Sequence, residues 1–198
     1  MSDLVTLRGL MGLADEPAPL SRSALVMVDC QNTYRHGVMA LAGIGPALEE
    51  AGRLLRLARS RGTPVFHIMH DAGEGSPYDV RAEIGRISDE VAPLPGEPVV
   101  VKAHPNAFFG TDLNDQLSAL SGRDLVLAGF MTHMCVNSTA RAAFNLGYRP
   151  TVVAAATATR DLPGRGGGCV PAETIQQASL AGMADLFALV VERSSDLP

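Results

Sequence analysis

Several features are scarce in this sequence of 198 residues, and each absence argues against a class of protein. No run of 18 apolar residues occurs, so no helix is expected to span a membrane. The net charge is -5 and no basic block exists, which makes nucleic acid an unfavourable partner, because phosphate binding needs clustered Lys and Arg. The start, Met1-Ser2-Asp3, lacks a basic stretch followed by an apolar one, so a secretory signal is not expected.

Cysteine is also scarce. The three cysteines, Cys30, Cys135 and Cys169, are odd in number and far apart in sequence. This pattern argues against a disulfide framework and against a Cys-rich zinc site. We therefore expect a cytoplasmic protein in a reducing compartment.

Lysine is the scarcest basic residue: of 16 basic residues, 15 are Arg and one is Lys, Lys102. A lysine presents a compact ammonium whose pKa can shift, which the planar guanidinium of Arg cannot do. The lone lysine is consistent either with a required chemical role at Lys102 or with the chance survival of a surface residue.

What the sequence does contain is enough apolar material for one folded domain. Hydrophobic residues make up 46% of the chain, and the length can bury a core without disulfides or metals. Residues 1–21 carry Pro17 and Pro19 and little periodicity, so they are interpreted as an N-terminal arm with at most a short helical turn. Residues 22–198 form the predicted domain.

Short apolar runs alternate with helical patterns along this domain. Strands are predicted at 24–28, 64–69, 98–101, 124–128, 151–155 and 186–191, and helices at 46–61, 112–120, 136–146 and 171–185. Residues 78–91 are predicted to be partly helical, and residues 165–168 to form a flexible loop. Apolar strands separated by helices indicate a parallel sheet covered on both faces. The predicted fold is a three-layer α/β/α sandwich with a six-stranded parallel sheet, Rossmann-like in its doubly wound topology.

Three chemically reactive side chains follow strands of this sheet. Asp29 ends the first strand, Lys102 the third, and Cys135 lies just beyond the fourth. Ligands bind outside the carboxyl ends of parallel strands, so these residues are predicted to meet there as a catalytic set. In that role Lys102 is expected at the rim of a pocket.

Cys135 is also predicted to open a helix, whose N-terminus favours the thiolate and offers N–H groups to an oxyanion. The alternative for Cys135 is a buried structural cysteine, and the alternative for Asp29 is a cap of the following turn.

Further residues are candidates for contact with a small-molecule substrate. They are Gln31, Tyr34, His70, Phe108 and His133. The five histidines lack the spacing of metal ligands, so no metal is expected. No cofactor is expected either, because Gly166-Gly167-Gly168 does not connect a strand to a helix as a dinucleotide loop does.

Three segments resemble those of the isochorismatase-like cysteine hydrolases. Val28-Asp29-Cys30-Gln31-Asn32 resembles the family's "VDxQN" strand end, residues 102–113 resemble its lysine segment "KxxxSAFxxTxL", and residues 129–136 resemble its nucleophile segment "GxxTxxCV". The match covers roughly residues 22 to 192. Asn106 stands where the family often has Ser, and the Asp-x-His metal segment of nicotinamidases is missing after the second strand.

The resemblance implies the six-stranded sandwich and a set of roles. Asp29 would take the thiol proton, Cys135 would attack a carbonyl carbon, and Lys102 would stabilise the charged pair. A cis peptide at Phe130-Met131 would direct the backbone N–H groups of Met131 and Cys135 at the oxyanion. A homo-oligomer is also implied.

The presence of Cys135 points to hydrolysis of a C–N bond through a thioester acyl-enzyme, and the missing Asp-x-His segment argues against a nicotinamidase. Two alternatives stay open at this point. One is vinyl ether hydrolysis with Asp29 as the acid, and the other is a non-catalytic binding protein on the same fold.

Overall fold

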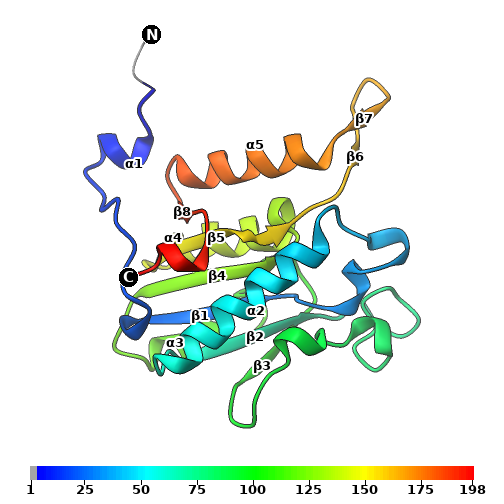
Figure 1. Cartoon of the computed structure of the whole chain (residues 1–198), viewed down its shortest axis with the longest axis horizontal. Helices are drawn as coiled ribbons and strands as arrows, with labels where there is room; N and C mark the ends of the chain where they lie inside the picture. Colours follow the sequence, from blue (N-terminus) through cyan, green and yellow to red (C-terminus); the bar gives the residue numbers. More distant parts are fainter. Residues whose placement is uncertain (1–3) are drawn as a thin grey trace.

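A six-stranded parallel sheet forms the centre of the computed structural model, which describes residues 4–198 (Figure 1). The strand order is β3-β2-β1-β4-β5-β8, and every neighbouring pair runs parallel. The strands are β1 (Ser23–Val28), β2 (Val65–His70), β3 (Val99–Lys102), β4 (Asp124–Phe130), β5 (Arg149–Ala158) and β8 (Leu189–Val191). The six predicted strands are confirmed, and with them the fold class.

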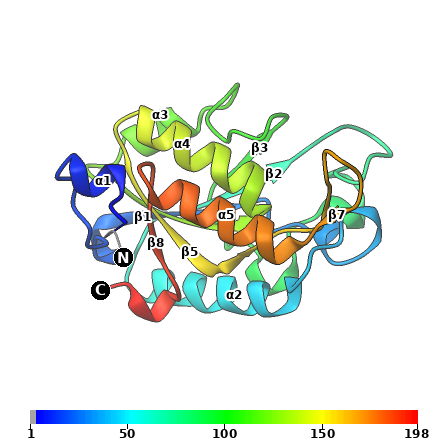
Figure 2. The same ribbon diagram turned by 90° about the horizontal axis from the view of Figure 1, so that it is seen from above.

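Helices cover both faces of the sheet, as the fully apolar strands require. On one side, α2 (Ile44–Ser60) packs against alternate residues of the central strands, such as Leu25 and Met27. On the other side, α3 (Leu113–Ser118), α4 (Asn137–Asn145) and α5 (Ala172–Ala184) pack against the residues between, such as Val26. Figure 2 shows α2 on the opposite side of the sheet from α3 and α4. Side chains that alternate between two cores explain why the strands are continuous apolar runs.

Two glycines occupy positions that no other residue fits well. The N–H groups of Gly62 and Thr63 bond the carbonyls of Arg59 and Ala58, which closes α2 with Gly62 in the left-handed region at φ 67°. At Gly129 the φ angle is 121°, and a Cβ there would meet the Val28 carbonyl oxygen at 1.9 Å. Strands β1 and β4 therefore approach closely beneath the edge where the site lies.

Two segments differ from the prediction. Residues 78–91 are not a helix but a loop with two 3₁₀ turns, Glu83–Gly85 and Asp89–Val91. The predicted flexible loop at 165–168 is instead the tip of a small hairpin, β6 (Leu162–Pro163) with β7 (Cys169–Val170). In both cases local hydrogen bonds replace the structure that the composition suggested.

The arm contains one helical turn, α1 (Leu7–Leu10), capped by the Thr6 side chain. Asp185 fixes it to the domain, since its carboxylate and carbonyl accept the N–H groups of Leu7 and Arg8 at 2.9 and 2.8 Å. Among residues 4–198, none of the helices combines the length and the apolar character needed to cross a membrane.

The topology determines where chemistry can take place. All strands end at the same edge. From β1 the chain first adds β2 and β3 on one side and then β4, β5 and β8 on the other, so the order of the strands reverses between β1 and β4. A doubly wound sheet opens a crevice at such a reversal. Asp29 follows β1 and Cys135 follows β4, so both lie at that position.

Candidate active site

The side chains of Asp29, Lys102 and Cys135 meet at the carboxyl edge of the sheet. Lys102 Nζ lies 2.6 Å from Asp29 Oδ2 and donates a hydrogen bond to Cys135 Sγ at 3.4 Å. The Asp29 carboxylate also lies close enough to the Cys135 thiol for its charge to raise the pKa of that thiol. A carboxylate, an ammonium and a thiol are thus close together, although Asp29 and Cys135 are 106 positions apart in the sequence.

Lys102 reaches this place only because its side chain is long. It ends β3, and β2 lies between β3 and β1, so its backbone is about 10 Å from that of Asp29. The ammonium crosses the end of β2 to form the ion pair. Both side chains of the pair are fully buried, so the expectation of a lysine at the rim of a pocket is wrong.

The backbone of Asp29 has an unusual conformation, which sets the direction of its side chain. It is the one non-glycine residue among residues 4–198 with a positive φ, 50°, a conformation in which Asp is tolerated better than most residues. Its N–H bonds the Ile68 carbonyl of β2 at 3.0 Å, so the peptide still belongs to the sheet. The chain then turns sharply, and the carboxylate is buried beside the Lys102 ammonium.

Cys135 lies in a wide helical turn directly after β4. Residues Thr132–Val136 form a π-helical turn that continues into α4, so the helix begins four residues earlier than predicted. The Met131 carbonyl accepts the N–H of Val136 at 3.2 Å, which widens the turn by one residue. The Phe130-Met131 peptide is cis. Single π-helical turns such as Thr132–Val136 are frequent at functional sites.

The protonation states follow from burial. Burial raises the pKa of Cys135 to about 12, and the negative charge of Asp29 adds to the effect. Burial therefore opposes the thiolate that the start of the helix was expected to favour. Burial also raises the pKa of Asp29, against the opposing charge of Lys102. The resting site holds a thiol beside an unusually basic carboxylate, which suits transfer of the proton during attack.

His70 completes the immediate surroundings of the ammonium. It lies opposite Lys102 in the β2–β3 register, and its Nδ1 is 3.3 Å from Lys102 Nζ. Burial and the Lys102 charge lower the pKa of His70 to about 4, so the imidazole is neutral and its Nδ1 can accept a hydrogen bond from the ammonium. His70 is half-buried beside the ammonium, and its contact with substrate stays a prediction.

Gln31 has a structural role in place of the predicted substrate contact. Its Nε2 donates to the carbonyls of His70 and Gly85, and its Oε1 accepts the His70 N–H at 2.9 Å. Both amide hydrogens are used and the residue is fully buried, so a substrate contact is contradicted. Gln31 instead ties the end of β2 to the loop that follows.

That loop presents Tyr78, a residue that the sequence did not single out. The Tyr78 ring stacks edge-on against His70 at 4.9 Å and against Tyr34 at 5.9 Å, and the two tyrosine hydroxyls are hydrogen-bonded. Tyr34 is 1% exposed and also packs on Phe130. Tyr34 therefore forms the floor of the site, and Tyr78 is the tyrosine at its surface.

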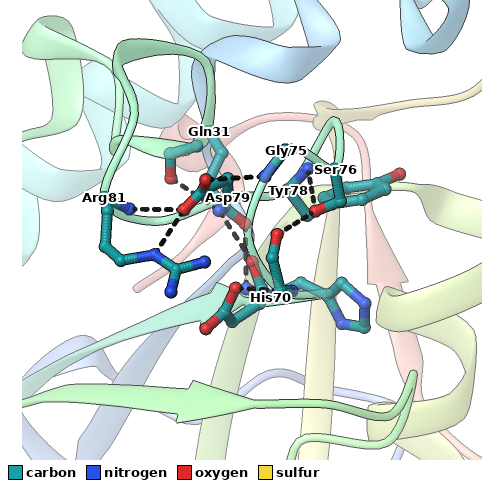
Figure 3. A network of polar contacts seen from close by, with 10 residues as sticks. Gln31, His70, Gly75, Ser76, Tyr78, Asp79 and Arg81 are labelled. Atoms are coloured by element: carbon teal, nitrogen blue, oxygen red, sulfur yellow. Dashed lines mark hydrogen bonds and ion pairs between the residues drawn. The ribbon is translucent and has the colours of Figure 1, made fainter.

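Asp79 holds the Tyr78 loop in shape. Its carboxylate accepts the N–H groups of Gly75 and Arg81 and the Nε of Arg81, at 2.9, 3.1 and 2.7 Å. Figure 3 shows this network, with the rings of His70 and Tyr78 on one side and Arg81 on the other. A loop tied at so many points fixes the position of Tyr78.

The remaining two candidates lie in different places. Phe108 stacks on Tyr148, which precedes β5 at the amino edge of the sheet, so the prediction that Phe108 lines the pocket is wrong. His133 lies in the Cys135 turn and contacts Thr159 through its Nδ1. Burial and the charge of Arg160 lower its pKa, which leaves it neutral.

The geometry of the site can be compared with known proteins. The family model of the isochorismatase domain matches residues 23–195. The chain belongs to the isochorismatase family. A crystal structure of an isochorismatase from Pseudomonas putida KT2440 superposes with a TM-score of 0.94 at 38% identity, covering 98% of this chain and 100% of that chain.

Two curated members of the isochorismatase family extend the comparison. The secreted isochorismatase effector Isc1 of Verticillium dahliae is 32% identical over 93% of this chain and 95% of its own length. The ureidoacrylate amidohydrolase RutB of Stutzerimonas stutzeri is 32% identical over 73% of this chain and 75% of its own length.

This isochorismatase-family chain lacks a visible metal centre in the part that the structure describes. Across residues 4–198 no three His, Cys, Asp or Glu side chains are grouped so that they could hold a metal ion. His67 is instead buried against Glu97 at 2.9 Å, and His104 stacks on Phe109. Asn106 caps its own turn by accepting the Phe108 N–H at 2.9 Å, a contact that a serine hydroxyl in this position can also make.

Proposed function

We propose that this chain is a cysteine-dependent hydrolase that cleaves a C–N bond of a small amide-type substrate. The observation that carries the proposal is the contact among Asp29, Lys102 and Cys135 at the carboxyl edge of the sheet. Membership of a family that includes a ureidoacrylate amidohydrolase supports it.

In the first half of the reaction, Asp29 takes the thiol proton while Cys135 Sγ bonds to the carbonyl carbon. The N–H groups of Met131 and Cys135 stabilise the oxyanion that forms. Lys102 supports the developing thiolate, because its ammonium already donates to Sγ. Asp29 then passes the proton to the leaving nitrogen, the C–N bond breaks, and a thioester remains on Cys135.

In the second half, Asp29 takes a proton from water, and the resulting hydroxide attacks the thioester. The carbon–sulfur bond breaks, the acid product leaves, and the proton returns to Cys135. Neither half needs a metal or a cofactor. His70 keeps the ammonium in place, since its neutral Nδ1 offers Lys102 Nζ a hydrogen-bond acceptor at 3.3 Å.

The proposal is tested with a panel of small primary amides, with ammonia release as the readout. We expect turnover by the wild type, and a thioester adduct on Cys135 that mass spectrometry detects after acid quenching. Cys135→Ala should lose nearly all turnover and keep the unfolding midpoint. Hydrolysis of a vinyl ether without any adduct, or full activity of Cys135→Ala, would refute the nucleophilic role. No turnover on any amide together with slow alkylation of Cys135 would favour a binding protein.

Compartment and assembly stay predictions. Cys30, Cys135 and Cys169 are all free, which agrees with a reducing cytoplasm, although the Verticillium relative is described as secreted. A homo-oligomer remains an expectation, which size-exclusion chromatography with light scattering tests directly.

A further inference from the structure

The amino edge of the sheet, opposite the edge that holds the nucleophile, carries a group of arginines. Arg22 precedes β1, Arg123 precedes β4, and Arg149 is the first residue of β5. The register pairs Ser23 with Asp124 and Asp124 with Arg149, so the three arginines begin three adjacent strands. Because neighbouring strands lie about 4.8 Å apart, three cations are gathered here in a chain whose net charge is -5.

The three arginine side chains line one hollow of about 630 Å³. Small residues and one acid complete its lining: Ser21, Ser121, Gly122, Asp124 and Gly147. Gly122 brings the two walls close together, since a Cβ there would meet the Arg22 carbonyl oxygen at 2.9 Å. The hollow therefore offers three guanidinium groups and one carboxylate to a ligand.

The protein itself leaves two of these guanidinium groups without a counter-charge. Asp124 accepts a hydrogen bond from Arg149 Nη2 at 2.7 Å. The guanidinium carbon of Arg123 lies 5.2 Å from the centroid of the Tyr148 ring. In the part of the chain that the structure describes, neither Arg22 nor Arg123 forms an ion pair. Like charges on neighbouring positions repel each other, so a bound anion would stabilise this arrangement.

A second cavity, of about 400 Å³, adjoins the hollow beneath the N-terminal arm, and Arg22, Asp124 and Arg149 line both. Figure 1 shows the arm running past the start of the strands at this edge. Apolar side chains from the arm and from the domain face each other across the cavity: Leu13, Pro17, Pro19, Phe144, Pro150 and Leu189. A ligand that fills both spaces would thus meet cations at one end and an apolar wall at the other.

Two charged residues of the arm also line the cavity beneath it, Arg8 and Glu16. Arg8 holds the arm to the domain, because its guanidinium donates to the Leu186 carbonyl at 3.1 Å and also to the Ala14 carbonyl. Taken together, the two spaces are lined by four arginines and two carboxylates, which leaves an excess of two positive charges.

We propose that the amino edge binds a small phosphorylated organic molecule, with its phosphate on Arg22 and Arg123 and its apolar body under the arm. A phosphomonoester carries nearly two negative charges at neutral pH, which equals the excess of positive charge. The planar fork of guanidinium donors also matches phosphate oxygens. This site lies at the other end of the strands from Cys135, so it does not depend on the proposed hydrolysis.

Isothermal titration calorimetry of the full chain with phenyl phosphate tests the site. Inorganic phosphate, which has no apolar body, and benzenesulfonate, which carries a single charge, are the comparison ligands at the same ionic strength. We expect both to bind at least about fivefold more weakly than phenyl phosphate. Equal binding of inorganic phosphate would refute the apolar part of the site, and equal binding of benzenesulfonate would refute recognition of a phosphate. Absence of phenyl phosphate binding at millimolar concentration would overturn the whole proposal.

The double variant Arg22→Gln/Arg123→Gln removes the two cations that lack a counter-charge. Both residues are exposed, so the fold should persist, which the unfolding midpoint checks. We expect the Kd for phenyl phosphate to rise at least about tenfold. Arg56→Gln/Arg165→Gln is the matched control, because it removes the same charge from exposed positions on α2 and at the hairpin tip. An unchanged Kd in the first variant, or an equal rise in the control, would overturn the site.

Leu13→Ser tests the apolar end separately. It should raise the Kd for phenyl phosphate at least about threefold and leave the Kd for inorganic phosphate as in the wild type. An equal rise for both ligands would refute the placement of the apolar body under the arm. If the double arginine variant does not fold, Arg22→Gln alone decides, with an expected rise in Kd of at least about threefold.

Discussion

Replacing Lys102 by methionine isolates the energetic role of the buried ion pair. The substitution keeps the length of the side chain and removes the ammonium 2.6 Å from Asp29 Oδ2. Because both side chains are fully buried, the carboxylate would be left without its counter-charge in a poorly solvated place. Breaking a buried pair from one side costs about 3–5 kcal/mol, and we expect a loss of this size in the free energy of unfolding.

The double variant Asp29→Asn/Lys102→Met supplies the decisive comparison. It removes both charges, so no uncompensated ion remains in the core. We expect it to be more stable than Lys102→Met, with a coupling free energy of at least about 2 kcal/mol. Arg86→Met is the surface control: its pair with Glu83, at 3.1 Å, is largely exposed and should be worth less than about 1 kcal/mol.

The loss in Lys102→Met should also depend on pH in a defined direction. The Lys102 charge lowers the pKa of Asp29, so its removal raises that pKa further above the value in the unfolded chain. Ionisation then opposes folding. The penalty is absent below the unfolded pKa, about 4, grows as the pH rises to the folded pKa, and is constant above it.

Urea unfolding of the wild type, Arg86→Met, the double variant and both single variants, Asp29→Asn and Lys102→Met, at pH 8 and pH 5 measures all of these quantities. The destabilisation of Lys102→Met should be smaller at pH 5 than at pH 8. A loss below about 1 kcal/mol at pH 8, or strict additivity in the double variant, would show that water reaches Asp29 and that the reasoning from burial fails.

Three further outcomes are expected. Lys102→Arg should lower the rate at least about tenfold, equivalent to about 1.4 kcal/mol of barrier, because a guanidinium does not fit between Asp29 and Cys135; an unchanged rate in a steady-state assay would contradict this. Glu97→Gln should cost about 2 kcal/mol of stability near neutral pH, because hydrogen bonds from Arg59 and the other neighbours of Glu97 lower its pKa to about 2. That stability is present above pH 4.5 and is lost as the pH falls towards 2. In acid titrations, the difference in stability between variant and wild type should therefore disappear near pH 2. Prolonged treatment with a chelator should leave the rate unaltered, whereas a loss that zinc or iron restores would show that a metal takes part.

The sequence predicted the sheet because apolar strands and their alternation with helices directly reflect burial on two faces. The same logic placed Asp29, Lys102 and Cys135 at one edge, since each follows a strand of a parallel sheet. Sequence position did not give the environment of these groups. The burial of Lys102 and the raised pKa of Cys135 depend on what packs around them, which no local pattern encodes.

The loops were the least predictable part of the site. Tyr78 enters it through a turn held by the Asp79 carboxylate, and such contacts leave no periodic signal in the sequence. Phe108 follows the Lys102 strand by six residues, yet its ring faces the opposite edge of the sheet. In each case tertiary packing, not local propensity, decides the direction of the side chain.

The burial of the single lysine has a practical consequence for labelling chemistry. Lys102 is the one side-chain amine in the sequence, and in the folded state none of that side chain is exposed. Activated esters and aldehydes, which acylate or condense with free amines, would therefore find no lysine on the native surface. Cross-linkers that join lysines cannot connect two copies of this protein, and acylation of Lys102 becomes a selective report that the fold has opened.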